Sequence, residues 1–83
     1  MNIFVGHLDH SVTDLHLQLL FGHFGEVDRA TVVKDHITGT SRKFGFVEMH
    51  DPAAARLAIR KLNGAPLEGS RLLVKPANSD RPN

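Results

Sequence analysis

The 83-residue chain contains no cysteine, so disulfide bonds and thiolate metal sites are excluded. Tryptophan and tyrosine are also absent, and five phenylalanines are the only aromatic residues. No apolar run approaches the roughly 20 residues that a membrane helix needs. The first residues also lack the basic and then apolar layout of a signal peptide. We therefore expect a cytoplasmic protein that makes no membrane contact.

The net charge of the chain is also small. Ten Lys and Arg residues against nine Asp and Glu residues give a formal net charge of +1 on a chain long enough for one small domain. Most non-specific affinity for nucleic acid comes from neutralised phosphates, so this charge is low for a nucleic-acid-binding protein. If the ligand is a nucleic acid, base stacking and locally placed cations must contribute more than the overall charge.

Two of the phenylalanines lie in an unusual setting within residues 42–49, RKFGFVEM. Strand alternation places Gly45, Val47 and Met49 on one face and Phe44, Phe46 and Glu48 on the other. A core-facing surface does not normally combine phenylalanine with glutamate. Solvent-facing rings on a central strand are typical of a stacking surface for nucleobases, and we expect that role here.

The periodicity predicts a first helix that begins after the N-cap Thr13 and ends at Gly25. Its buried stripe follows helical spacing and consists of Leu17, Leu20, Phe21 and Phe24. We therefore expect the rings of Phe21 and Phe24 to lie in the core, and we assign them no role in ligand binding. Leu15 lies off this stripe and is expected to be exposed.

A second helix is expected between the N-cap Asp51 and the stop at residues 63–64. Its buried face would hold Ala55, Ala58, Ile59 and Leu62. Further strands are expected at residues 2–5, 27–34 and 71–75. Leu72 and Val74 would point inward from the last of these strands.

The element order βαββαβ indicates an α+β, ferredoxin-like sandwich. We expect a four-stranded antiparallel sheet of order 4-1-3-2, counted along the chain, with two helices on one face and the other face open. Strands one and three are neighbours in this order, so Phe4 would join Phe44 and Phe46 on the open face. The domain is expected to span residues 1–76, followed by a flexible tail at residues 77–83.

The chain resembles the RNA recognition motif family over nearly its whole length. Residues 3–8, IFVGHL, are similar to the family's hexapeptide motif, and residues 42–49 are similar to its octapeptide motif. Lys43 replaces a glycine of the octapeptide, Met49 replaces its final aromatic residue, and His7 stands where asparagine is common. The short chain looks most like the small single-domain bacterial and cyanobacterial members.

The resemblance implies roles for individual residues. The rings of Phe4 and Phe46 would each stack on a base, Phe44 would pack against the sugars between them, and Arg42 would pair with phosphate. Lys43 would add a cation beside them. Groups at the rim would read base edges or contact phosphate, and these are Asn2, Thr31, Glu48, Arg71, Lys75, Ala77 and Asn78.

Six histidines raise the question of a metal site, but the spacing in residues 7–10, HLDH, matches no zinc or iron pattern and lacks a third ligand. We expect no metal and no cofactor. His7 and His36 would instead add charge near RNA below about pH 6.5. No nucleophile–base pair, phosphate loop or paired carboxylate motif is visible, so we do not expect an enzyme.

Two functions remain open at this point. The first is the binding of single-stranded RNA, and possibly of single-stranded DNA, by a monomer that covers about two to four nucleotides with modest affinity. Such a protein would act in RNA regulation or as an RNA chaperone. The alternative is a protein-interaction module that docks a peptide on the helical face or on the open sheet. The exposed rings favour the first function, and the low net charge and Leu15 favour the second.

Overall fold

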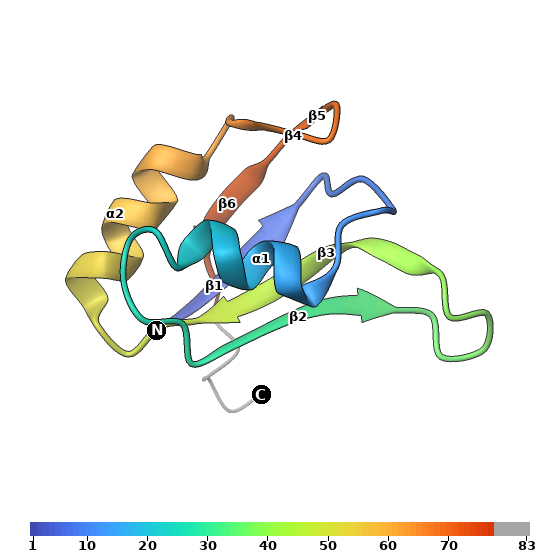
Figure 1. The fold of residues 1–83 in the computed structure, drawn as a ribbon, viewed down its shortest axis with the longest axis horizontal. Coiled ribbons are helices and arrows are strands. Elements are labelled where there is room, and N and C mark those ends of the chain that lie inside the picture. The colour runs from blue at the N-terminus through green and yellow to red at the C-terminus, as the bar shows by residue number, and fades with distance from the viewer. Residues whose placement is uncertain (78–83) are drawn as a thin grey trace.

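The computed structural model describes residues 1–77, in which a curved sheet carries two helices on one face (Figure 1). The elements in chain order are β1 (Asn2–Gly6), α1 (Asp14–Phe21), β2 (Arg29–Lys34), β3 (Ser41–Glu48), α2 (Pro52–Leu62), β4 (Pro66–Leu67), β5 (Ser70–Arg71) and β6 (Leu73–Pro76). The four-stranded sheet has the order β2-β3-β1-β6, and all of its neighbouring strands are antiparallel. The predicted ferredoxin-like fold is confirmed. Neither helix of the described part is long and apolar enough to span a membrane.

The register of the sheet fixes which side chains are neighbours across the strands. Phe4 of β1 pairs with Phe46 of β3 on one side and with Lys75 of β6 on the other. Phe46 in turn pairs with Thr31 of β2. Directly paired residues share a face of a sheet, so Lys75, Phe4, Phe46 and Thr31 form one row across all four strands.

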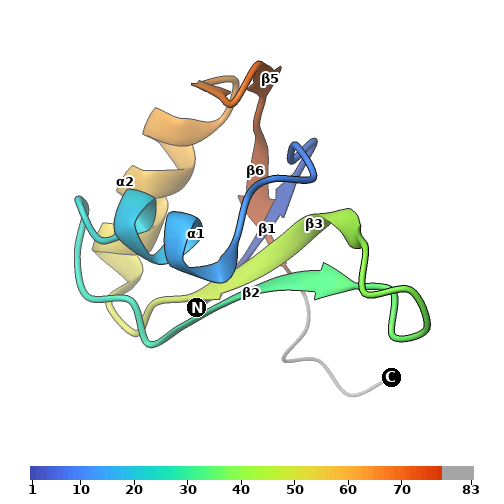
Figure 2. The ribbon, with the colours of Figure 1, turned by 45° about the vertical axis from the view of Figure 1, so that its right-hand side comes forward.

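The core lies between the helices and the inner face of the sheet. Its members from the strands and the residues next to them are Ile3, Val5, Val32, Val47, Met49, Leu72 and Val74, and Ala30 packs against this core while remaining partly exposed. The helices contribute Leu17, Phe21, Ala54, Ala55, Ala58 and Leu62. Leu20 and Phe24 pack against this core while remaining partly exposed. Figure 2 shows α1 and α2 on the same side of the sheet, so no helix of residues 1–77 lies on the opposite side.

The start of α1 is confirmed, and its predicted end is wrong. The Thr13 hydroxyl accepts a hydrogen bond from the His16 N–H, and His16 Nδ1 accepts one from the Thr13 N–H, which completes a capping box. The helix ends at Phe21 with Gly22 as its C-cap, well before Gly25. A Cβ on Gly25 would lie 2.7 Å from the Cβ of Ala54, so the absence of a side chain at this glycine serves close packing on α2.

Helix α2 begins and ends as predicted. The Asp51 carboxylate accepts a hydrogen bond from the Ala53 N–H at 3.0 Å, and Pro52 occupies the first helical position. At the other end the Asn63 side-chain oxygen accepts a hydrogen bond from the Val74 N–H at 3.0 Å. This bond ties the end of α2 to the edge strand β6.

The last predicted strand, residues 71–75, is divided in the structure. Leu72 donates its N–H to the Ala65 carbonyl and accepts from the Gly64 N–H, so it pairs with the segment after α2 and not with β1. Residues 66–71 form the small β4–β5 hairpin, with Glu68 and Gly69 at positive φ in its turn. Strands of two residues are too short to show a period in the sequence.

Candidate nucleic-acid interface

Three phenyl rings lie together on the face of the sheet opposite α1 and α2. The ring centroids of Phe4 and Phe44 are 5.8 Å apart in a stacked arrangement, and those of Phe4 and Phe46 are 5.8 Å apart with one edge toward the other ring. Phe44 and Phe46 are 6.1 Å apart and nearly perpendicular. We refer to these three side chains as the ring cluster. Each is half-buried, so part of each ring is in contact with solvent.

The Phe4 ring has neighbours on the same face that fix its orientation. A Cβ on Gly6 would lie 2.7 Å from Phe4 Cε2, so the ring lies over the glycine and needs the space that it leaves. The Lys75 ammonium stands 5.3 Å from the ring centroid, within the range of a cation–π contact. The alternating pattern places Leu73 beside Gly6 on this face, and the sequence analysis assigned it no role. It is half-buried and extends the apolar surface next to Phe4.

Strand β3 begins with an irregularity next to the ring cluster. Its register with β2 shifts between Val32 and Lys34, and Lys43 has a φ of 68°, in the left-handed region. The Lys43 N–H donates to the Ser41 hydroxyl at 3.0 Å, which helps to hold this conformation. Gly45 lies where β3 pairs with β2, and a Cβ on this residue would overlap the Thr31 carbonyl oxygen. The glycine at this position is therefore required by packing.

The cations near the ring cluster have carboxylates beside them. The pKa of Asp35 is lowered mainly by the N–H groups of Ile37 and Thr38, and the charge of Arg42 adds to this effect. The pKa of Asp9 is lowered mainly by its hydrogen bonds from Ser11, with a smaller contribution from Lys43. The positive potential at this end of the sheet is therefore reduced by the two carboxylates.

Most of the predicted rim residues in the described part lie on this face, and Arg71 is directed away from it. Glu48 pairs with Asn2 on one side and with Arg29 on the other, which forms a second row next to the Phe4–Phe46 row. The Arg71 guanidinium instead donates to the Gly64 carbonyl at 2.8 Å, which directs it toward the end of α2. The Ala77 N–H donates to the Asn2 carbonyl at 2.9 Å, and Asn78 lies outside the described residues.

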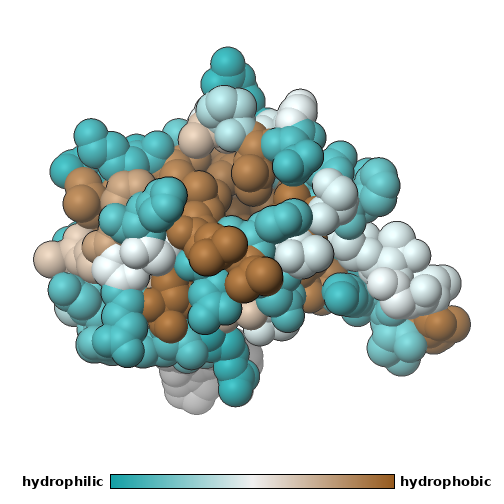
Figure 3. Space-filling model, viewed as in Figure 1, coloured by the Kyte–Doolittle hydropathy of each residue, from teal (hydrophilic) through white to brown (hydrophobic). Residues whose placement is uncertain are grey.

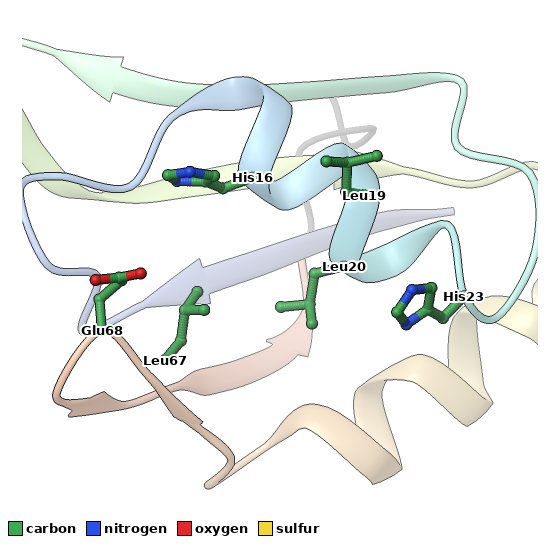
Figure 4. A pocket seen from close by; sticks show the side chains of 6 residues that line it. All are labelled: His16, Leu19, Leu20, His23, Leu67 and Glu68. Carbon is green, nitrogen blue, oxygen red and sulfur yellow. The ribbon is translucent and has the colours of Figure 1, made fainter.

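A separate groove of about 240 Å³ lies on the helical face, between α1 and the β4–β5 hairpin. In Figure 4 Leu20 and Leu67 project into it, and it is also lined by His16, Leu19, His23 and Glu68. Apolar surface gathers over α1 and toward the hairpin in Figure 3. The expected exposure of Leu15 is confirmed at 58%, and Leu19 is 60% exposed. Within residues 1–77 no three His, Asp or Glu side chains are grouped as metal ligands.

A four-stranded sheet with aromatic rings on its open face is typical of the RNA recognition motif. Residues 3–73 match the family model of the RNA recognition motif, and the chain belongs to that family. It is 45% identical over 80 residues to the mitochondrial glycine-rich RNA-binding protein 2 of Arabidopsis thaliana, covering 96% of this chain and 50% of that protein. The chain therefore spans half the length of this plant relative.

Two further proteins match the chain over most of their own length. The putative RNA-binding protein RbpD of a Nostoc species is 40% identical over 84 residues, which covers 98% of this chain and 89% of that protein. The crystal structure of the RNA-binding protein PG1 superposes with a TM-score of 0.93 at 44% identity, covering 100% of this chain and 99% of that one. The expected likeness to the small single-domain bacterial members is confirmed.

Proposed function

We propose that this protein binds single-stranded RNA on the open face of its sheet. The observation that carries the proposal is the convergence of three phenyl rings, from residues some forty positions apart in the chain, on the side of the sheet opposite the two helices. Phe4 and Phe46 each stack on a base, and Phe44 packs against the sugars between them. Family membership and relatives that are named as RNA-binding proteins support this function.

The affinity follows from stacking more than from charge. Each stacked base contributes about 1–3 kcal/mol, so the ring cluster supplies much of the roughly −8 kcal/mol that corresponds to a micromolar complex. Arg42, Lys43 and Lys75 are exposed near the rings and contact phosphate. Thr31 and the backbone at Ala77 contact the bound RNA from opposite edges of the sheet.

The protein acts as a binding module without catalytic activity, in RNA regulation or as an RNA chaperone. We place it in the cytoplasm as a monomer that also accepts single-stranded DNA. An RNA that is bound through rings and a few cations exchanges rapidly, which suits a chaperone.

A pair of alanine variants tests the proposal. Phe46→Ala removes one stacking ring from the open face, and we expect RNA binding to weaken by more than about tenfold because one stacked base is lost. Leu19→Ala is the matched control, because it removes a large exposed apolar side chain from the helical face. Fluorescence anisotropy with short unstructured RNAs measures both, and circular dichroism checks the fold. Equal affinity of the two variants would contradict the proposal.

The groove on the helical face supports a second candidate function, the docking of a peptide. Leu19 and Leu20 line it, and most of the Leu19 side chain is open to solvent. A protein partner that binds there would be lost in Leu19→Ala and retained in Phe46→Ala, which is the reverse of the pattern expected for RNA.

A further inference from the structure

We infer that the base stacked on Phe46 is guanine, read by Glu48 and Arg29; this inference rests on the proposed RNA binding. Glu48 follows Phe46 by two residues on the same face of β3, and Arg29 of β2 is the direct cross-strand partner of Glu48. The ring and the two charged side chains therefore occupy adjacent rows of the open face.

The spacing of the rows suits a base edge. Two residues along a strand are separated by about 6.6 Å, so the edge of a base that lies on the Phe46 ring is within reach of the side chains in the Glu48 row. Directly paired residues have Cβ atoms about 4.5–5.5 Å apart, so Glu48 and Arg29 can contact neighbouring atoms of the same base. Both side chains are exposed, and within residues 1–77 neither takes part in an ion pair.

The carboxylate of Glu48 selects guanine because it can only accept hydrogen bonds. Guanine presents two parallel donors on its Watson–Crick edge, the N1–H and the 2-amino group, which match the two carboxylate oxygens. Adenine and cytosine each present one amino group beside a ring nitrogen that repels a carboxylate. Uracil presents a single N–H between two carbonyl oxygens, which repel it as well.

Arg29 completes the pattern from the neighbouring strand. The guanine O6 lies next to N1–H on the same edge, and it is an acceptor that a guanidinium binds well. The Glu48 carboxylate on β3 therefore accepts from the guanine N1–H and 2-amino group, and the Arg29 guanidinium on β2 donates to the adjacent O6. No other base presents a donor pair followed by an acceptor in that order.

The test measures the affinity of four RNA pentamers, UUXUU with X as G, A, C or U, for the wild-type protein and for Glu48→Gln. We expect the G pentamer to bind the wild type at least about tenfold more tightly than the others, as a good bidentate contact to a base provides. In Glu48→Gln this preference falls below about threefold, because the amide offers only one acceptor. The matched control, Glu68→Gln, removes the same charge from the hairpin turn on the helical side and keeps the preference.

Inosine at the central position separates the carboxylate contact from other causes of a guanine preference. Inosine lacks the 2-amino group, so we expect the inosine pentamer to bind the wild type several-fold more weakly than the guanosine pentamer. For Glu48→Gln we expect the two pentamers to bind with equal affinity. Wild-type binding of all four pentamers with equal affinity, or a guanine preference that survives in Glu48→Gln, would overturn the inference and leave the proposed function standing. Failure of every pentamer to bind would overturn the proposed function and this inference together.

Discussion

The Leu8 N–H donates a hydrogen bond to the Lys43 carbonyl oxygen across 2.9 Å, which joins the segment after β1 to the irregular start of β3. The residues at this junction are strained. Lys43 and His7 have φ values of 68° and 60°, a left-handed conformation that costs an L-residue roughly 1–2 kcal/mol. Strained residues of this kind cluster at functional sites. Both are exposed at the end of the strands that carry the ring cluster.

Replacement of Lys43 by glycine should separate stability from binding. We expect Lys43→Gly to raise the free energy of unfolding by about 0.5–1 kcal/mol, because glycine adopts this φ without strain. RNA affinity should fall a few-fold, and the slope of log K against log salt should decrease by about 1 when one phosphate contact is lost. Urea denaturation and binding at several salt concentrations measure these effects.

Lys43→Ala is the control for that comparison. It removes the same charge and keeps the strain, so it should lose RNA affinity without gaining stability. If Lys43→Gly were no more stable than Lys43→Ala, the left-handed conformation of this residue would not be the source of the strain.

Replacement of Gly45 by alanine should destabilise the fold. The added Cβ would overlap the Thr31 carbonyl oxygen and lie 3.1 Å from the Val32 Cα, so β2 and β3 would have to separate. Overpacking of this kind costs about 1–3 kcal/mol, which lowers the melting temperature by about 4–8 °C for each kcal/mol in a domain of this size. Thermal unfolding measures the change. An unchanged melting temperature in Gly45→Ala would contradict the packing role of this glycine.

The fold was predictable because its signals are local. The capping residues Thr13 and Asp51 mark the helix starts through their own side chains, and the structure shows both caps. The convergence of Phe4 with Phe44 and Phe46 followed from alternation together with the order of the strands. The caps and the alternation depend on residue type and short spacing, and the order of the strands follows from the element order βαββαβ.

The features that were not predicted depend on contacts between distant segments. The sequence predicts a helix end at Gly25, but in the structure this glycine allows the chain to approach Ala54 of α2 closely. A lysine does not by itself indicate a left-handed conformation, and the one signal at this position was that Lys43 replaces a glycine of the octapeptide motif. The pair of His50 and Asp28 is separated by 22 positions and forms only when β2 and β3 lie side by side.

That pair gives a pH dependence. His50 Nδ1 lies 2.9 Å from an Asp28 carboxylate oxygen, and this hydrogen bond is the main cause that raises the pKa of His50 above its ordinary 6.5. A raised pKa in the folded state adds stability that is fully present below about pH 6.5 and is lost as the pH rises through the folded-state value. The stability difference between the wild type and His50→Gln should therefore shrink as the pH increases from about 6 to 8.

Titration of the histidine ring protons by NMR provides the direct measurement. His50 should titrate at a higher pH than it does in Asp28→Asn, which removes the charge and keeps the shape of the partner. A wild-type midpoint for His50 at or below its ordinary value would contradict the pairing with Asp28.

The central claim is that the ring cluster forms the RNA-binding surface, and amide chemical-shift mapping during an RNA titration tests it most directly. With a short unstructured RNA we expect the largest changes at Phe4, Phe44 and Phe46 and along β1 and β3, while α1 and α2 change little. Changes confined to the groove around Leu19, or no change on β1 and β3 at near-millimolar RNA, would contradict the account.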